Sequence, residues 1–210
     1  MNEEATIKNL TEDIINEFLN FINEEDLRGM VDKIIRKGYD KGLEQAELDF
    51  NMNFIPNHRT VEFINNFTFE NVKDLTNNLK DNLRKEVSIA LMNRETPSNI
   101  RSRIRDVMDT TIERAKMIQV TETNRAENMG HYQGAKESGL NIVKKWDAQP
   151  ERTSRAGNKV PCIQCESLDG QEVGIDDKFK DHKGREFFLP PTHPNCACRV
   201  IYVQKDDDKK

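Results

Sequence analysis

The sequence predicts an α+β protein, in which a mainly helical N-terminal part precedes a small C-terminal α+β module. Apolar residues recur at intervals of three and four as far as residue 139, which is the spacing of amphipathic helices. All four cysteines lie between residues 162 and 198, in a segment rich in loop-forming residues. Charged residues make up 33% of the chain and hydrophobic residues 35%, so part of the core must be thin.

Residues 1–95 are predicted to form the helical N-terminal region. Its first helix is expected over residues 7–22, where the apolar side chains form a single stripe. A second helix is expected over residues 25–51. Gly38 and Gly42 disfavour one unbroken helix there, so a kink or break is expected near Gly38.

A connection over residues 51–59 separates these helices from a longer apolar pattern. That pattern continues from residue 61 to residue 91, and it predicts either one long helix or two helices separated at Asn65-Asn66. Residues 96–203 follow as a second domain, which also begins with helices.

The second domain is expected to begin with two helices. A proline flanked by hydroxyl residues at positions 96–98 fits the first turn of a helix, and it predicts a short helix that ends at residue 108. A further helix is expected over residues 110–139, with Gly139 as its C-terminal stop.

The helix expected over residues 110–139 contains an unusually polar run, Thr-Glu-Thr-Asn-Arg at residues 121–125, and such residues weaken a helix. Either the run forms a buried hydrogen-bond network or polar site, or Glu122 and Arg125 merely pair while the threonines bond to the preceding turn. We predict a structural network that fastens this helix to the C-terminal module. Its members are Thr121, Glu122, Thr123, Arg125 and Trp146.

Residues 142–203 are predicted to form the C-terminal module. Strands are expected at residues 142–146 and 199–203, because each is a short run rich in β-branched and aromatic residues. Between them, Asp169-Gly170 is typical of a tight turn and predicts a hairpin-like return of the chain.

The cysteines form two close-spaced pairs, Cys162 with Cys165 and Cys196 with Cys198, and His193 stands three residues before the second pair. A Cys-x-x-Cys turn holds two thiolates, and a second pair can complete a tetrahedron around Zn²⁺. Five candidate ligands thus compete for four places, and His193 either binds the metal or orients a neighbouring ligand. Metal binding on the order of 10 kcal/mol would stabilise a segment too small for its own core.

Other interpretations of the cysteines are weaker. The chain begins Met-Asn-Glu-Glu without an apolar signal-peptide core, so a reducing cytosol is expected and disulfides are disfavoured. A redox pair normally opens a helix after a buried strand, whereas Cys162 follows a polar run and Pro161. The remaining alternative to a structural zinc site is that the cysteines are free thiols that bind no metal.

Composition excludes several classes of protein. No apolar run approaches the roughly 18 residues that span a bilayer, so no membrane-spanning segment is expected. The net charge of −5, with excess acids in residues 1–60, does not fit a dedicated nucleic-acid binder. Glycine-rich phosphate loops, His-Glu-x-x-His and nucleophile elbows are absent from the sequence, so no enzyme is predicted. The charged tail, residues 204–210, is expected to be disordered.

An ordered set of short motifs runs through residues 100–203. The set consists of Arg114-Ala-Lys-Met-Ile118, the Thr-Glu-Thr-Asn-Arg run with Ala126, Gly139, Lys144-Lys145-Trp146, Cys162-x-x-Cys165, Leu168-Asp169-Gly170, Pro190-Pro191 and His193-Pro194-Asn195-Cys196-x-Cys198. In this order the motifs resemble the phage head morphogenesis family, the minor head proteins similar to the F protein of phage Mu. The family's frequent arginines are replaced by Val120 and Ala197.

The resemblance implies a minor head protein of a tailed virus or provirus, acting in head assembly and in DNA packaging or delivery. It implies a location in the virion, and in the host cytoplasm during assembly. The implied partners are the portal protein and other head proteins, and contact with packaged DNA is left open. Residues 96–203 would be the Mu F-like domain, and residues 1–95 are expected to carry the association with other virion proteins. A nucleic-acid-binding zinc protein, or less plausibly an enzyme using Glu122, is the alternative.

Overall fold

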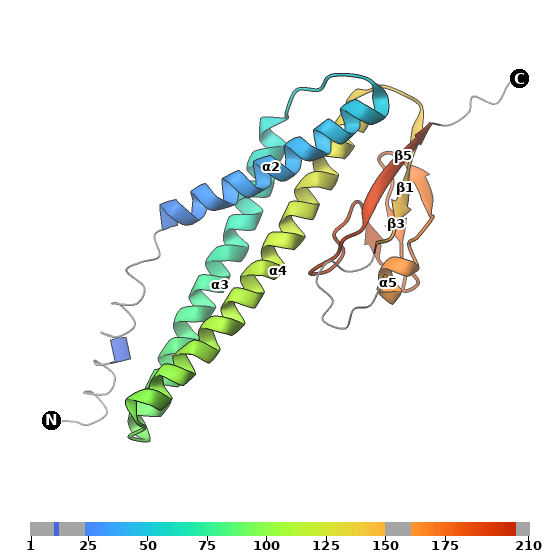
Figure 1. The fold of residues 1–210 in the computed structure, drawn as a ribbon. Coiled ribbons are helices and arrows are strands. Elements are labelled where there is room, and N and C mark those ends of the chain that lie inside the picture. The colour runs from blue at the N-terminus through green and yellow to red at the C-terminus, as the bar shows by residue number, and fades with distance from the viewer. Residues whose placement is uncertain (1–10, 13–23, 150–160, 205–210) are drawn as a thin grey trace, which may run out of the picture. The chain divides into compact units, whose positions relative to one another are not determined.

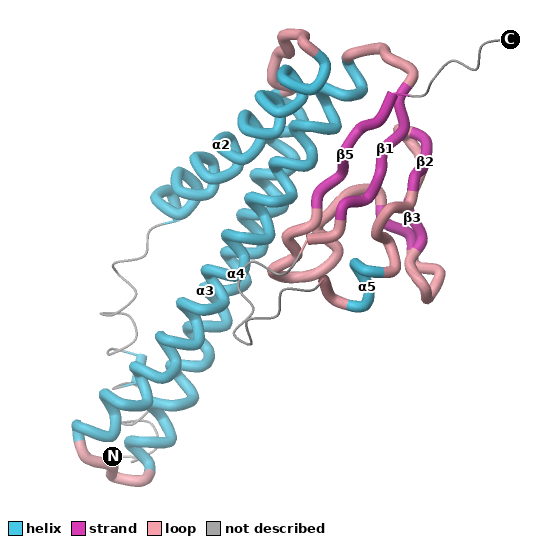
Figure 2. The backbone as a smooth tube through the Cα atoms, turned by 45° about the vertical axis from the view of Figure 1, so that its right-hand side comes forward, coloured by secondary structure: helices cyan, strands magenta, loops and turns pink. Residues whose placement is uncertain are grey.

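The computed structural model describes residues 11–12, 24–149 and 161–204, and Figure 1 shows the helices and strands that they form. Three long helices are followed by a small module of strands, turns and one short helix, as Figure 2 shows by colour. The helices are α2 (Glu24–Phe50), α3 (His58–Met92), α4 (Pro97–Glu137) and α5 (Ile163–Glu166). The strands are β1 (Ile142–Asp147), β2 (Glu172–Gly174), β3 (Phe179–Lys180), β4 (Glu186–Phe187) and β5 (Arg199–Gln204). The predicted α+β fold class is confirmed.

Two of the predicted helix boundaries are wrong. The helices expected over residues 97–108 and 110–139 form the single helix α4, because the hydroxyls of Thr110 and Thr111 donate to the carbonyls four residues earlier and leave the helix intact. Helix α2 runs through Gly38 without the expected break, and α3 is one helix. The predicted helix over residues 7–22 and the charged tail lie outside the described residues, apart from residues 11–12 and 204.

The C-terminal module is built on an antiparallel sheet with the strand order β2-β1-β5. Gly139, with a φ of 65°, follows the end of α4 as predicted, and β1 begins three residues later. The Asp169-Gly170 turn is present, but its two flanks do not form a hairpin together. Instead the amide of Gly170 donates to the carbonyl of Trp146, and the chain enters β2 beside β1.

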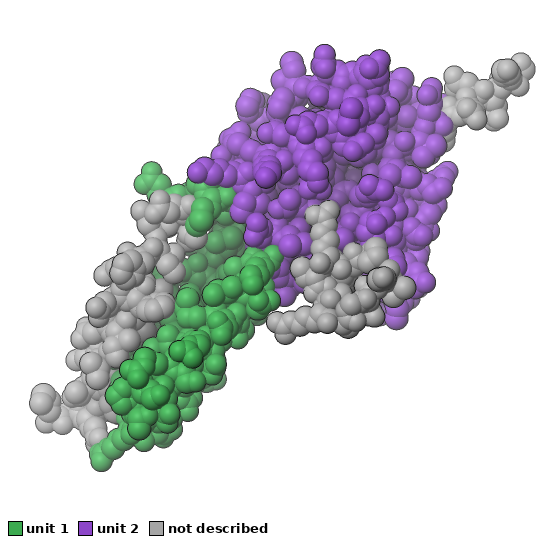
Figure 3. Space-filling model, in the orientation of Figure 1, with its two compact units in different colours: residues 1–31, 67–116 green, residues 32–66, 117–210 purple. Residues whose placement is uncertain are grey.

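The chain folds into two compact units, which Figure 3 shows in different colours. Each long helix contributes residues to both units. Unit 1 comprises residues 1–31 and 67–116, and unit 2 comprises residues 32–66 and 117–210. The division into domains at residue 95 stays a prediction. Among the described residues, no helix is both long enough and apolar enough to cross a bilayer.

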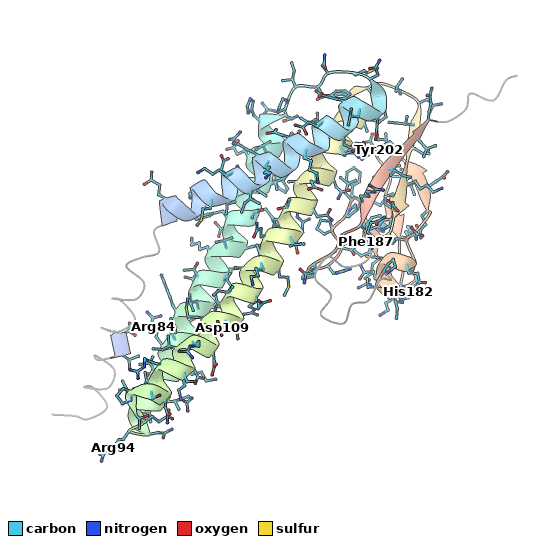
Figure 4. All side chains as sticks on the ribbon, viewed as in Figure 1. Arg84, Arg94, Asp109, His182, Phe187 and Tyr202 are labelled. Carbon is cyan, nitrogen blue, oxygen red and sulfur yellow. The ribbon has the colours of Figure 1, made fainter. Side chains whose placement is uncertain are left out.

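Unit 1 has a thin apolar core supported by ion pairs. Leu79 and Leu83 of α3 are buried against three partly buried side chains of α4: Ile104, Val107 and Met108. The guanidinium of Arg103 pairs with Glu86 at 2.6 Å and with Glu95 at 2.7 Å. Arg84, labelled in Figure 4, pairs with Glu12 at 2.9 Å.

In unit 2, helices α2 and α4 pack closely because small residues face each other. A Cβ atom at Gly42 would lie 2.0 Å from the carbonyl oxygen of Glu127, and one at Gly130 would lie 2.1 Å from that of Tyr39. Real Cβ contacts are never this short, so only glycine fits at either position. This close contact explains the glycines of α2, which act in packing and not as breaks.

The core of the C-terminal module surrounds the middle of the sheet. Trp146 of β1 packs edge-to-face on Phe179 with ring centroids 5.0 Å apart, and both side chains are buried with Cys165, Cys196 and Cys198. The lone tryptophan and the cysteines therefore share one core.

Lys144 of β1, two residues before Trp146, is fully buried on the same face of the sheet as that residue, and its ammonium group lies 5.4 Å from the centroid of the Phe179 ring. Its ammonium group donates to the carbonyl of Phe188 at 3.0 Å and lies 3.5 Å from the centroid of that residue's ring. Burial lowers the pKa of Lys144 to about 8.

Candidate metal centre and its helix clamp

The first cysteine pair is presented by the short helix α5. Cys162 is the N-cap of this helix, and its sulfur accepts a hydrogen bond from the amide of Cys165 at 3.4 Å. The Cys-x-x-Cys spacing thus directs both sulfurs to one side of a single turn. Cys165 is buried, whereas Cys162 is partly exposed.

The second group of candidate ligands comes from the turn that leads into β5. Asn195 adopts a φ of 61°, and the amide of Cys196 donates to the carbonyl of His193 at 3.2 Å, so the chain reverses tightly between them. Cys196 and Cys198 are both buried. Asparagine tolerates the left-handed conformation better than most residues, which suits it to this position.

All five candidate ligands lie together. The Nε2 atom of His193 is 3.1 Å from the sulfur of Cys162 and 3.3 Å from that of Cys165. The sulfurs of Cys165 and Cys196 are 3.8 Å apart, and Cys198 completes a second group with them. Within each group the ligand atoms lie within 4.8 Å of one another, and Cys165 belongs to both groups. This cluster could hold a metal ion.

The orientation of His193 suits a metal ligand. Its Nδ1 atom lies 2.8 Å from the carbonyl oxygen of Pro194, which fixes the proton on Nδ1 and leaves the lone pair of Nε2 facing the sulfurs. A neutral imidazole held in this tautomer by a backbone carbonyl is the usual form of a metal-binding histidine.

The buried sulfurs are also electrostatically suited to a cation. A hydrogen bond with Cys196 raises the pKa of the Cys165 thiol, with contributions from Cys198 and from burial. Hydrogen bonds with Cys165 and Cys198 lower the pKa of Cys196 to about 2. The group by itself favours one thiolate with protonated neighbours, and a bound cation would allow the other thiols to ionise.

Helix α4 holds the second cysteine pair through two buried asparagines, here termed the asparagine clamp (Asn124 and Asn128). The amide nitrogen of Asn124 donates to the carbonyls of Cys196 and Cys198, both at 3.0 Å. The side chain of Asn128 donates to Cys198 at 3.3 Å and accepts from the amide of Val200 at 3.0 Å. The clamp thus satisfies the backbone on both sides of Cys198.

The predicted structural network is distributed over several contacts. The hydroxyl of Thr121 accepts a hydrogen bond from the amide of Asn195 at 3.0 Å, so it reaches the cysteine turn. Glu122 and Arg125 pair at 2.8 Å, and Thr123 lies against α2 at Gly38. The fifth member, the tryptophan of β1, belongs to the cysteine core. Their action as one network stays a prediction.

Sequence reasoning missed the two asparagines that make the most direct contacts. With Thr121 they occupy positions i, i+3 and i+7, which lie on one face of a helix. The helical spacing of the two asparagines was detectable in the sequence, but their partners lie about seventy residues away along the chain.

A polar cavity of about 360 Å³ adjoins the clamp. It is lined by Lys41, Gly42, Gln45, Asn124, Glu127, Asn128, His131, Gln149, Ala197 and Arg199. Glu122 does not line this cavity. The arrangement therefore gives no support to Glu122 as a catalytic residue there.

A family model fits the segment that carries these features. Residues 81–201, more than half of the chain, match the family described as Phage Mu protein F like protein, and the chain belongs to this family. It is similar to the "Minor head protein GP7" of Bacillus phage SPP1, with 26% identity over 133 residues. That alignment covers 60% of this chain and 41% of GP7.

A second relative has a different name. The chain is 28% identical over 148 residues to the "NAD(+)--arginine ADP-ribosyltransferase EFV" of Enterococcus faecalis, which covers 63% of this chain and 29% of that protein. The chain therefore spans less than half of the length of either relative. No solved structure matches it.

Proposed function

We propose that the chain is a minor head protein of a tailed phage or provirus, associated with the portal and acting in head assembly and in DNA packaging or delivery. Membership of the Mu F-like family over residues 81–201 carries this proposal, and the similarity to a minor head protein supports it. The proposed location is the virion, with the host cytoplasm as the place of assembly. Residues 1–95 are proposed to carry the association with other virion proteins, and residues 96–203 are proposed to form the Mu F-like domain with its zinc module at residues 142–203.

The proposed cofactor is one structural Zn²⁺ in the cysteine cluster. The separation of 3.8 Å between the sulfurs of Cys165 and Cys196 matches the edge of a tetrahedron, about 3.8 Å, that follows from Zn–S bonds of about 2.3 Å. Thiolates and a neutral imidazole are also the ligands that zinc prefers. The proposed ligands are drawn from Cys162, Cys165, His193, Cys196 and Cys198.

Cys165 lies close to all four other candidates, so we propose that it is a ligand in whichever set binds. When bound, zinc would link α5 to the turn before β5. Such a link would stabilise a module whose strands β2, β3 and β4 contain only two or three residues each.

The proposed function can be tested in the phage or in an induced provirus. Mass spectrometry of purified virions should detect the chain together with the portal, and the tagged full-length chain should retain the portal during purification. Absence of the chain from virions and procapsids, together with no retention of the portal, would contradict the proposal. A deletion of the gene is expected to lower the yield of infectious particles.

ADP-ribosyl transfer is a second candidate because one relative carries that name. We propose instead that this chain is not itself an enzyme, since the similar segment represents 29% of that protein and Glu122 is buried in a pair with Arg125. Incubation of the chain with labelled NAD⁺ and an arginine-rich acceptor tests this directly. Incorporation of label above that of a heat-denatured control would overturn the assignment.

A nucleic-acid-binding zinc protein remains the weaker alternative. Arg103 in the first part of α4 is paired with two glutamates, and the whole chain carries a net charge of −5. Neither observation favours a phosphate-binding surface.

A further inference from the structure

The last turn of α2 and the connection from α2 to α3 carry large aliphatic side chains that face solvent. Leu48 is 78% exposed, Ile55 is 82% exposed and Met52 is 40% exposed. Single exposed aliphatic residues are common on protein surfaces, but a contiguous group of them marks a site of interaction.

These side chains lie along two adjoining hollows. One hollow, of about 480 Å³, is lined by Glu44, Glu47, Leu48, Asn51, Met52 and Asn53. The other, of about 700 Å³, is lined by Met52, Asn53, Phe54, Ile55, Pro56, Asn57 and Glu137. Met52 and Asn53 line both, so the two hollows form one continuous surface. We call it the α2–α3 surface and define it by Glu44, Glu47, Leu48, Met52, Ile55 and Glu137.

The backbone under this surface is held in place. The amide of Phe54 donates to the carboxylate of Glu47 at 3.1 Å, and the amide of Asn57 donates to the hydroxyl of the buried Tyr39 at 3.3 Å. The side chain of Asn57 in turn accepts from the amides of Arg59 and Thr60 and caps α3. The exposure of Ile55 is therefore a property of an anchored connection, and the surface is preformed.

The charge of the surface has one sign. Glu44, Glu47 and Glu137 line the two hollows, and among the residues that the structure describes neither lining includes a lysine or an arginine. Three carboxylates around an aliphatic strip repel a nucleic-acid backbone and an anionic lipid surface. They complement a protein segment that carries aliphatic side chains beside lysine or arginine.

We propose that the α2–α3 surface is the docking site for a helix of a partner protein that presents aliphatic side chains flanked by basic residues. Helix-in-groove binding of this kind uses a few aliphatic anchors at helical spacing, which fits a strip of three. A stable interface covers about 800 Å² on each partner, which is more than three side chains supply. The three aliphatic side chains would therefore form only the centre of the interface. The inference rests on the proposed function, for which it supplies the place where a head partner binds.

The test uses the full-length chain and two probes, the purified portal protein of the same phage and a short synthetic helix of leucine and lysine. Leu48→Gln with Ile55→Gln removes the aliphatic strip, and Glu44→Lys reverses one charge without removing any hydrogen bond described for the structure. Met92→Gln is the matched control, because Met92 is 68% exposed and, as the last residue of α3, is not part of the α2–α3 surface. Circular dichroism verifies that each variant retains the fold.

We expect the double variant to lose about tenfold or more in affinity for the portal and for the basic helix. Glu44→Lys should weaken binding and flatten its dependence on salt, while the control variant stays within about twofold of the unchanged chain. Portal binding that is unaffected by the double variant would overturn the docking site and leave the proposed function intact. Binding of the basic helix alone would support the docking site but count against the portal as its partner. Failure of both probes, or equal binding of an acidic leucine–glutamate helix or of lipid vesicles, would overturn the inference.

Discussion

Replacement of Asn124 by aspartate is the sharpest test of the asparagine clamp. The two side chains have nearly the same shape, so packing is conserved while the donor is removed. In the unchanged chain the amide nitrogen of Asn124 donates to the carbonyls of Cys196 and Cys198 at 3.0 Å each. In Asn124→Asp, a carboxylate oxygen would face both carbonyl oxygens.

The expected loss follows from these contacts. A buried polar group that loses its partner costs about 1–3 kcal/mol, and the carbonyl of Cys198 keeps its bond from Asn128. Adding the repulsion between the carboxylate and two carbonyls, we expect Asn124→Asp to lower the free energy of unfolding by about 2–5 kcal/mol. Asn124 orients the proposed metal ligands through their backbone carbonyls, so its replacement should also lower the affinity for the metal by about 10–100-fold.

Urea unfolding followed by circular dichroism, with reductant and zinc present, gives the free energy of unfolding. Competition with a chromophoric chelator gives the affinity for zinc. Asn77→Asp is the control, since Asn77 is an exposed residue of α3, and its change should stay within about 0.5 kcal/mol. A variant Asn124→Asp as stable as this control, with unchanged zinc affinity, would refute the role of the clamp.

Three further predictions concern packing, pH and the pair of Glu122. Gly130→Ala should destabilise the chain by about 1–3 kcal/mol in urea unfolding, because the added Cβ would lie 2.1 Å from a carbonyl oxygen of α2. Gly29→Ala is the control: its Cβ would meet open space, so the change should be neutral or stabilising by up to about 1 kcal/mol. The pKa of Lys144 is about 8 in the folded chain and about 10.5 when unfolded, so between these values the unfolded chain binds more protons and stability rises with pH. Below pH 8 the buried lysine is charged, which destabilises the fold, and its deprotonation should raise the free energy of unfolding by about 3 kcal/mol by pH 10.5. The variant Lys144→Met should lack this rise. Equal pH dependence of stability in the two proteins would count against the prediction. Glu122→Gln should lower the free energy of unfolding by about 1–3 kcal/mol by calorimetry, and an unchanged melting temperature together with loss of a measurable turnover would instead favour catalysis.

The sequence was most informative where the chemistry is local. The close spacing within each cysteine pair predicts a ligand cluster, because a short turn directs both sulfurs to the same side. The structure brings all five candidate ligands together. The helices of the N-terminal part follow from periodicity, and Gly139 from its place after the last turn. These inferences need no knowledge of distant parts of the chain.

Features that depend on packing between distant parts of the chain could not be predicted from the sequence. Gly38 and Gly42 weaken an isolated helix, yet in unit 2 they allow close contact with α4, so the predicted break is absent. A boundary was predicted between residues 108 and 110, but the hydroxyls of Thr110 and Thr111 bond within the helix, which continues unbroken. Asn124 looked unfavourable in mid-helix because its partners, which offset that penalty, lie in the cysteine turn.

The metal content of the full-length chain tests the central claim most directly. Protein purified under reducing conditions without added metal should contain about one zinc per chain by elemental analysis. Cys165→Ser should lose most of that zinc, because Cys165 lies within 4.8 Å of every other candidate ligand, and it should be less stable by several kcal/mol. Less than about 0.2 zinc per chain, with no uptake when zinc is supplied to the reduced protein, would contradict the assignment of a structural zinc site.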